Sequence, residues 1–413
     1  MNKQTIIDNN ARIDALTKRL NNSTFADVRD TTATAGDVAS GKIFYDKDGL
    51  KTIGTGEIKE FPDMLQARVD ATNSCKYLFY YYNGTNVDFL ENLDTSSVTD
   101  MTNMFSNCSK LITIPLLDTR NVTNMYKMFQ SCNKLTEIPQ MDTSKVTNMA
   151  NMFQTNSALT SIPQLDTSSC TDMNYMFESC SNITTIPQLD TINVTNMSYM
   201  FKSCSKLTEI PQMNTSKVTN MYEMFSSCKS LTTIPQLDTS KVSTMQSMFR
   251  YCESLTTIPK LDTRNVYDFS YMFYDCKSLT KISELDMIYA GNLSMMFANC
   301  TNLTNLTLKN IKKTLQIGSG TSYGTLLTDE SIINTAKELW DLTGATSQKL
   351  TLSTTSNARL DAIYVKLVDV TDEMIAEDEY ISNKKPCVVC ESTDTGAMTL
   401  REYVISKNWQ ISV

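Results

Sequence analysis

The stretch KVTNMYEMFSSCKSLTTIPQLDTS, residues 217–240, is followed at once by KVSTMQSMFRYCESLTTIPKLDTR, residues 241–264. The second stretch is nearly the first again, and the same period of 24 residues carries a phenylalanine from Phe105 to Phe297. An aspartate recurs with this period from Asp94 to Asp286, and Asn214 replaces it once. A unit this short cannot bury its own apolar face, so its copies must stack on each other. The sequence therefore predicts a stacked-repeat protein, with nine copies over residues 94–309.

Each copy contains two short elements. The first has apolar residues at intervals of three and four, which predicts a helix or 3₁₀ helix of about three turns. Its members in one copy are Val218, Met221, Met224, Phe225 and Cys228. The second is the extended piece 231–234, which Pro235 ends because proline cannot donate to a longer ladder. An Asp-Thr or Asp-Ser turn then leads into the next copy.

The motif M-F-x-x-C-x-x-L-T-x-I-P-x-L-D-T-S-x-V-T-x-M resembles the BspA-like leucine-rich repeats of bacterial surface and phage proteins. This resemblance implies an α/β solenoid of 24-residue units, with a small N-terminal attachment module and a C-terminal α+β cap. Residues 59–93 are expected to hold the N-terminal cap and residues 310–413 a C-terminal cap or tip domain. A shift of 24 residues back from the first copy places six cap residues on core positions: Tyr77, Tyr80, Tyr81, Val87, Leu90 and Leu93.

Two segments precede the cap. Residues 1–27 predict a helix whose Ile6, Ile13, Leu16 and Leu20 follow a heptad pattern; it either starts an oligomer or docks on its own domain. Residues 28–58 predict a short capped helix, a glycine turn and two strands joined by Asp48-Gly49. The sequence motif D-T-T-A-T-A-x-D-V-x-S-G-K resembles a module of phage tail, baseplate and tail-fibre proteins. That resemblance implies attachment to baseplate or tail proteins through the N-terminal region.

The C-terminal part predicts a helix in TDESIINTAKELWDLTG, beginning at Thr328-Asp329 and ending at Gly344, and a helix plus a short strand in LREYVISKNWQISV. The combination of LTLSTTSNARL with a terminal KNWQI resembles the ending of phage leucine-rich-repeat tail proteins. Residues 361–400 separate the two pieces and are an insertion in that pattern.

Composition narrows the function. The formal net charge is −8, which argues against nucleic acid and anionic membranes as partners. The chain has no histidine, so histidine-based nucleophile pairs and histidine-containing zinc sites are excluded. It has no apolar run of 18 residues and no apolar core in its first 20 residues, so we expect neither membrane insertion nor export by the general route. We expect no cofactor and no enzymatic activity.

A cysteine recurs at one position of the repeat: Cys108, Cys132, Cys180, Cys204, Cys228, Cys252, Cys276 and Cys300, with Asn156 in the third copy. A ladder of parallel thiols offers no tetrahedron for zinc and poor Cβ vectors for disulfides. Asparagine and cysteine can both donate to a backbone group, so buried structural thiols are favoured over both alternatives. Cys387-Val-Val-Cys390 is a single pair, for which a surface turn or local packing is favoured over a redox motif.

Threonines recur at the outward position of the extended piece, from Thr136 to Thr280, and predict a solvated face. Aromatic residues and arginines gather instead in the later copies, and exposed tyrosines beside arginines are typical of protein hot spots and of sugar stacking. Tyrosine packing between copies is the alternative. The candidate receptor-binding residues are Tyr222, Arg250, Tyr251, Arg264, Tyr267, Tyr271, Tyr274 and Tyr289.

Together these features predict a non-enzymatic receptor-binding component of a phage tail or phage-tail-like particle, assembled in the host cytoplasm and located at the tail tip or baseplate. Its expected partner is a host cell-surface protein or glycan, and its expected assembly is a homotrimer, as is common for tail fibres. The alternatives are a BspA-like bacterial surface adhesin, a carbohydrate-cleaving tail enzyme and an intracellular scaffold.

Overall fold

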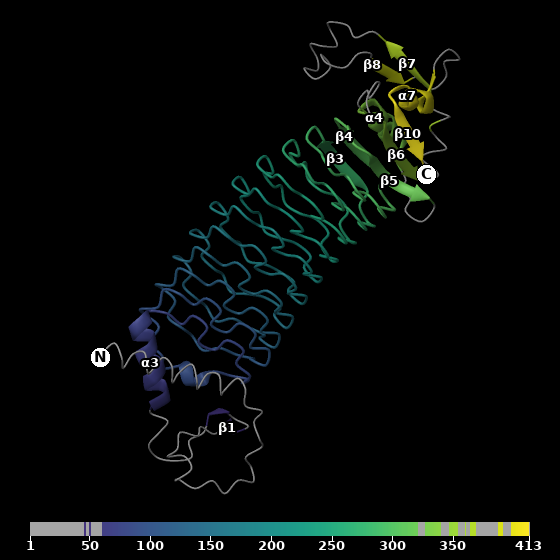
Figure 1. Ribbon diagram of the computed structural model, residues 1–413. Coiled ribbons are helices and arrows are strands. Elements are labelled where there is room, and N and C mark those ends of the chain that lie inside the picture. The colour runs from purple at the N-terminus through teal and green to yellow at the C-terminus, as the bar shows by residue number, and fades with distance from the viewer. Residues whose placement is uncertain are drawn as a thin grey trace. The chain divides into compact units, whose positions relative to one another are not determined.

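A computed structural model (Figure 1) describes residues 45–46, 49–50, 60–320, 327–339, 347–353, 360, 364–368, 387–390 and 398–412. The chain forms two compact units, Met1–Lys217 and Val218–Val413, whose boundary falls inside the predicted repeat region. Each unit is described by itself. None of the helices in this part of the chain has both the length and the apolar character of a membrane-spanning segment.

The first unit begins with a short hairpin. Strands β1 (Tyr45–Asp46) and β2 (Gly49–Leu50) pair antiparallel, with Tyr45 opposite Leu50. Two strands were expected on either side of Asp48-Gly49, and the structure has them, with Gly49 already inside the second strand. The predictions for residues 1–27 and for the rest of 28–58 lie outside the described residues.

Helix α3 (Glu60–Thr72) follows and was not expected from the repeat pattern. Pro62 lies in its first turn, where a missing amide hydrogen costs no hydrogen bond. Leu65 and Val69 are buried. The amide group of Gln66 donates to the carbonyl of Asp94 at 3.0 Å and accepts from its N–H at 2.8 Å, which ties the helix to the first repeat.

The predicted register of the N-terminal cap is wrong by two residues. Phe79, rather than Tyr81, stacks on Phe105, with ring centroids 5.8 Å apart, and Ser74 bridges Asp100 in parallel, 26 residues away. Tyr77 and Tyr81 are consequently exposed, while Val87 and Leu90 are buried as expected; Tyr80 and Leu93 are half-buried. A short 3₁₀ helix, η2 (Asp88–Leu90), closes the cap. The extra two residues lie between Phe79 and the first full repeat, so a uniform shift cannot locate them.

Beyond the cap, residues 24 apart in the chain lie side by side within the first unit, and we call each such passage a coil. Parallel bridges join Asp100 to Asn124 and continue through each following coil to Asn196. The repeated phenylalanines are fully buried and stack ring on ring, as Phe105 does on Phe129 with centroids 5.7 Å apart and planes 5° apart. Burying each ring stabilises the unit by about 2–3 kcal/mol. The predicted stacking of the copies is thus present.

The helix predicted within each copy is wrong, because the segment is a run of turns. In the first coil the N–H groups of Met101, Asn103 and Phe105 donate to carbonyls of the next coil at 2.9 Å. Met104 and Ser106 donate three positions back along their own coil, Met104 to the carbonyl of Met101 at 3.1 Å, while the N–H of Thr102 donates to Asp100 Oδ1 at 2.9 Å. Two residues of each run have positive φ, here Asn103 and Asn107. An α-helix would keep all these donors within itself, and the stack uses half of them between coils.

The repeated cysteines are buried thiols that hydrogen-bond to the backbone, as favoured. Cys180 Sγ donates to the carbonyl of Phe153 at 3.0 Å, and Asn156 Nδ2 fills the same role toward Phe129 at 3.0 Å. The pattern holds at the other ladder positions for which such bonds are described, in both units: Cys108, Cys132, Cys204, Cys252, Cys276 and Cys300. The ten cysteines whose side chains the structure describes, from Cys75 to Cys300, are free thiols. Burial raises the pKa of Cys180 and Cys300 to about 12, so these thiols stay protonated and act as donors.

The second unit, from Val218 on, is also built of coils, and regular strands occur only in the last of them. Strands β3 (Lys281–Asp286) and β4 (Asn305–Lys309) pair in parallel, with Lys281 opposite Asn305. The corresponding segments of the earlier coils form no regular strand. The strand expected in every copy is therefore present only in these last coils. The threonines predicted to face outward, from Thr136 in the first unit to Thr280 in the second, are all exposed.

The C-terminal part of the second unit combines helices with a parallel sheet, as the expected α+β cap requires. Helix α4 (Asp329–Lys337) is capped by Thr328, so its predicted start is correct, but it ends well before Gly344. Strands β5 (Leu315–Gly320), β6 (Gln348–Ser353) and β10 (Trp409–Ser412) form a sheet in the order β10-β6-β5. The two segments paired in the sequence resemblance are therefore neighbouring strands. Helix α7 (Leu400–Ser406) precedes β10, as predicted.

The insertion of residues 361–400 contains a sheet of its own. Strands β7 (Tyr364–Val368), β8 (Cys387–Cys390) and β9 (Met398–Thr399) pair antiparallel in the order β8-β7-β9. Cys387 and Cys390 are therefore the ends of a strand. Of the two expectations for them, the surface turn is wrong, and local packing stays a prediction. Their register places Cys390 opposite Val365 and Cys387 opposite Val368.

Candidate binding surface

The side chains between the core positions of the turn runs form a surface that we call the turn face. In the copy at 221–228, the core positions are Met221, Met224, Phe225 and Cys228, and the turn face has the positions of Tyr222, Glu223, Ser226 and Ser227. Core positions are nearly constant from copy to copy, and turn-face positions are not. The position of Ser226 holds, in chain order, Ser106, Gln130, Gln154, Glu178, Lys202, Ser226, Arg250, Tyr274 and Ala298.

In the second unit the structure brings four predicted residues together on this face. The Arg250 guanidinium carbon lies 4.7 Å from the ring centroid of Tyr251, 5.2 Å from that of Tyr271 and 5.4 Å from that of Tyr274. Arg250 Nη2 also donates to the Tyr251 hydroxyl at 3.2 Å. We call these four residues the Arg250 cluster. Each guanidinium–ring contact contributes about 0.5–1 kcal/mol at a partly exposed position.

The backbone of two adjacent coils positions this cluster. The N–H of Tyr251 donates to the carbonyl of Tyr274 at 2.8 Å, which sets the two residues side by side. Tyr251 and Tyr271 both have positive φ, 59° and 57°, so their side chains leave the chain at angles that a helix would not give. The rings of Tyr251 and Tyr274 then meet edge to face, with centroids 5.5 Å apart and an interplanar angle of 85°.

The other predicted residues do not join the cluster. In the described part of the chain, Arg264, Tyr267 and Tyr289 make no ring contact or hydrogen bond with it. Tyr267 and Tyr289 are exposed by 64% and 66%, and the Tyr267 ring covers the side of Gly291 where a Cβ would stand. Tyr222 is half-buried on the turn face, and its N–H donates to Asn220 Oδ1 at 2.9 Å.

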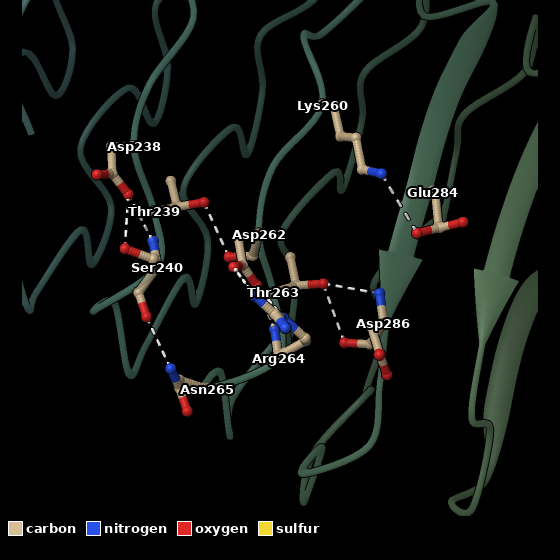
Figure 2. A network of polar contacts seen from close by, with 10 residues as sticks. All are labelled: Asp238, Thr239, Ser240, Lys260, Asp262, Thr263, Arg264, Asn265, Glu284 and Asp286. Carbon is tan, nitrogen blue, oxygen red and sulfur yellow. Dashed lines mark hydrogen bonds and ion pairs between the residues drawn. The ribbon is translucent and has the colours of Figure 1, made fainter. Parts of the chain in front are cut away.

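Arg264 lies instead in a shallow groove of about 710 Å³ along the Asp-Thr turns of the second unit (Figure 2). Arg264 Nη2 is 2.7 Å from Asp262 Oδ2, and Lys260 Nζ is 3.5 Å from Glu284 Oε1. The Thr263 hydroxyl donates to the carbonyl of Asp286 at 2.9 Å and accepts from its N–H at 2.7 Å. The contacts of Lys260 and Thr263 link one coil to the next, and the Arg264 ion pair lies within its own turn.

Three carboxylates of the groove have lowered pKa values. Hydrogen bonds from Ser240 keep the pKa of Asp238 below its ordinary value, and the Arg264 guanidinium does the same for the pKa of Asp262. Hydrogen bonding to Lys309 lowers the pKa of Glu284. A glycoside-cleaving acid needs the opposite shift, so the groove has the chemistry of a structural seam.

The first unit carries a second aromatic group that the predicted site residues did not include. Tyr175 and Tyr199 stack in parallel, with centroids 4.2 Å apart, and Lys202 Nζ lies 5.0 Å from the Tyr199 centroid. Burial raises the pKa of the Tyr175 phenol. The signal was available in the sequence, because the two tyrosines are one repeat length apart and so must be neighbours in a stack.

In each unit the fold stacks repeats whose variable side chains lie between the constant core positions of the turn runs. Residues 73–184, 132–233, 155–257 and 228–322 match the family model described as "Mycoplasma protein of unknown function, DUF285". Together these matches span residues 73–322, more than half of the chain, and the chain belongs to this family. No curated protein matches the sequence.

Several solved leucine-rich-repeat structures are similar to the chain at low identity. A T. pallidum leucine-rich-repeat protein is 17% identical, with a TM-score of 0.25 over 48% of this chain and 78% of that one. A leucine-rich-repeat protein from Eubacterium ventriosum is 20% identical, with a TM-score of 0.28 over 46% of this chain and 53% of that one. A leucine-rich cell surface protein from Faecalibacterium prausnitzii is 16% identical, with a TM-score of 0.23 over 56% and 75%.

Proposed function

We propose that this chain is a non-enzymatic recognition protein of the BspA-like kind, which acts as a surface adhesin and binds a protein partner through the turn face. One observation carries the proposal: the polar groups that recur in every repeat bond to neighbouring coils or within their own turns, and the residues that change lie between the core positions of the turn runs. The recurring thiols bond to phenylalanine carbonyls, as Cys180 does at 3.0 Å. The recurring aspartates accept hydrogen bonds within their own turns, as Asp166 does from the Ser168 hydroxyl at 2.6 Å.

The proposal includes no catalysis, because the recurring thiols and aspartates lack the pKa shifts that a nucleophile or a general acid needs. A nucleophile needs a neighbouring base or a lowered pKa, and burial instead raises the pKa of the described thiols Cys75, Cys170 and Cys180. A general acid among the carboxylates needs a raised pKa, and those of Asp142, Asp166 and Asp238 are lowered by serine hydrogen bonds.

A phage-tail location is a second candidate, favoured by the sequence of residues 28–58 and by the hairpin of β1 and β2 within it. In that case the same turn face would meet the host surface, and the N-terminal region would bind baseplate or tail proteins. The homotrimer belongs to this second candidate. A monomeric mass in light scattering would contradict it for the isolated chain.

The test has two arms. In the first arm, fluorescently labelled full-length chain is incubated with intact bacterial cells, and the bound chain is measured by flow cytometry. We expect saturable binding that unlabelled chain competes away. Binding that does not saturate, or release of reducing sugar from purified cell-surface polysaccharide, would overturn a non-enzymatic adhesin. Location is read separately by mass spectrometry: the adhesin predicts peptides of this chain in the cell-envelope fraction, and the tail component predicts them in purified particles.

A further inference from the structure

Arg250 is a cation without a counter-ion in the part of the chain that the structure describes. Two arginines elsewhere in the repeats each lie 2.7 Å from an aspartate, Arg120 from Asp118 and Arg264 from Asp262. No ion pair links Arg250 to a described carboxylate. The acids of neighbouring positions are taken by lysines, since Glu253 pairs with Lys229 and Lys277, and Asp275 pairs with Lys277.

The Arg250 cluster also leaves donor capacity unused. Arg250 is half-buried, and its Nε is buried without a hydrogen-bond partner among the described atoms. Rings that surround a guanidinium replace part of its water but do not neutralise its charge. A partly desolvated cation with free donors attracts a carboxylate much more strongly than a fully hydrated surface arginine does.

The arrangement of the rings favours a protein as the source of that carboxylate. Sugar stacking uses an open, flat ring face, whereas the three tyrosines turn toward Arg250 and meet each other at 85° and 56°. The guanidinium carbon lies within 5.4 Å of all three ring centroids, so one positive charge stands among the three rings. Tyrosine and arginine in a preorganised group are the residues that dominate protein–protein hot spots.

We propose that the Arg250 cluster is the anchor of the turn face and that it receives an aspartate or glutamate side chain of a protein partner. The proposal rests on the recognition function above and names its contact. It also places recognition on the turn face rather than on the face that carries Thr232, Thr256 and Thr280, whose main-chain groups link the coils.

The test uses the full-length chain on an array of 15-residue peptides from surface proteins of the cells it binds. Each peptide containing aspartate or glutamate is paired with a twin carrying asparagine or glutamine. The expected result is a set of acidic peptides bound at least about tenfold more strongly than their twins, with that preference lost in Arg250→Gln. Arg264→Gln is the matched control, because it removes an equal charge from the groove, and it should keep the preference.

Two further variants separate recognition from folding. Tyr251→Phe and Tyr274→Phe keep the rings and remove the hydroxyls, and they should weaken acidic-peptide binding by about three- to tenfold with unchanged thermal unfolding. Equal binding of acidic peptides and twins, or no peptide bound, would overturn the proposal. Binding to acidic glycans alone, lost in Arg250→Gln, would assign the carboxylate to a sugar and overturn the protein partner. If cells bind the Arg250→Gln chain as well as the wild type, the recognition function stands and the anchor is wrong.

Discussion

Asn156 donates its side-chain amide to the main-chain carbonyl of Phe129 at 3.0 Å, in the place where other coils use a thiol. The substitution is imperfect, because Asn156 is fully buried and its Oδ1 has no hydrogen-bond partner among the described atoms. A cysteine makes the same hydrogen bond with its single sulfur atom and has no second polar atom that would need a partner. The third copy of the repeat therefore has an unsatisfied acceptor at the ladder position, which the copies with a cysteine there lack.

Replacing this residue by the consensus one should stabilise the protein. Asn156→Cys removes a buried acceptor that costs about 1–3 kcal/mol when it is unsatisfied, so we expect the free energy of unfolding to rise by about 1 kcal/mol. Urea denaturation under reducing conditions measures the change. Asn156→Ala is the matched control and should lower stability, since it leaves the Phe129 carbonyl without its donor. An Asn156→Cys protein less stable than the wild type would contradict this account.

The positive φ angles of the turn runs give a second prediction. Thr155 is β-branched and has φ of 62°, a conformation that favours glycine or asparagine. Thr155→Gly or Thr155→Asn should therefore stabilise the chain by about 0.5–1 kcal/mol. The control is Thr160→Asn, at an exposed position outside the set of positive φ angles, which should change stability by less than about 0.5 kcal/mol. Equal effects at both positions would contradict the role of backbone strain.

The aspartate ladder predicts sensitivity to acid. Hydrogen bonds from Ser168 lower the pKa of Asp166 in the folded state, and similar bonds lower that of Asp142. A lowered folded-state pKa gives stability that is present above the ordinary value of about 3.9 and is lost as the pH falls through the folded-state pKa. The urea midpoint should thus fall between about pH 5 and about pH 2.

Asparagine should remove part of this dependence. Asn214 accepts from the Ser216 hydroxyl at 2.7 Å, as Asp166 does from Ser168 at 2.6 Å, so Asp166→Asn keeps the turn and removes the titration. We expect near wild-type stability at neutral pH and a smaller loss in acid. An unchanged pH profile would show that other groups govern acid unfolding.

The thiols should be inert until the protein unfolds. Burial raises the pKa of Cys170 to about 11 and that of Cys180 to about 12, so almost no thiolate is present at mildly alkaline pH. Iodoacetamide followed by peptide mapping should leave the ten described cysteines unlabelled in the native protein and label all of them in concentrated urea. Rapid native labelling of Cys180 would contradict its burial.

The repeat length, the core and the thiol ladder follow from the sequence because they depend only on which residues recur. The helix in each copy was wrong because spacing reports which side chains are buried, and the turn run buries the same residues as a helix while sending its amide hydrogens to the next coil. The cap failed for a different reason. Cys75, Leu78, Phe79 and Tyr82 keep the spacing of Met101, Met104, Phe105 and Cys108, but they stand 26 residues away.

Four of the eight candidate site residues lie together for a reason that the stack explains. Arg250 and Tyr274 differ by one repeat length, and Tyr251 and Tyr274 by one residue less, so they must be neighbours. Tyr267 is close to them in the sequence and yet has a different position in the repeat. In a stacked protein the separation modulo the repeat length predicts proximity better than nearness along the chain.

The main-chain bonds between coils have a consequence for how such a protein changes over time. Phe105 N–H donates to the Met128 carbonyl, and Phe129 N–H donates in the same way to the Met152 carbonyl. The contact between one pair of coils in the first unit is therefore equivalent to the contact between the next pair. The near-identical sequences of the copies are suited to unequal recombination. A gene of this kind can gain or lose a whole coil in one event, and the new protein keeps its core while displaying a different series of side chains.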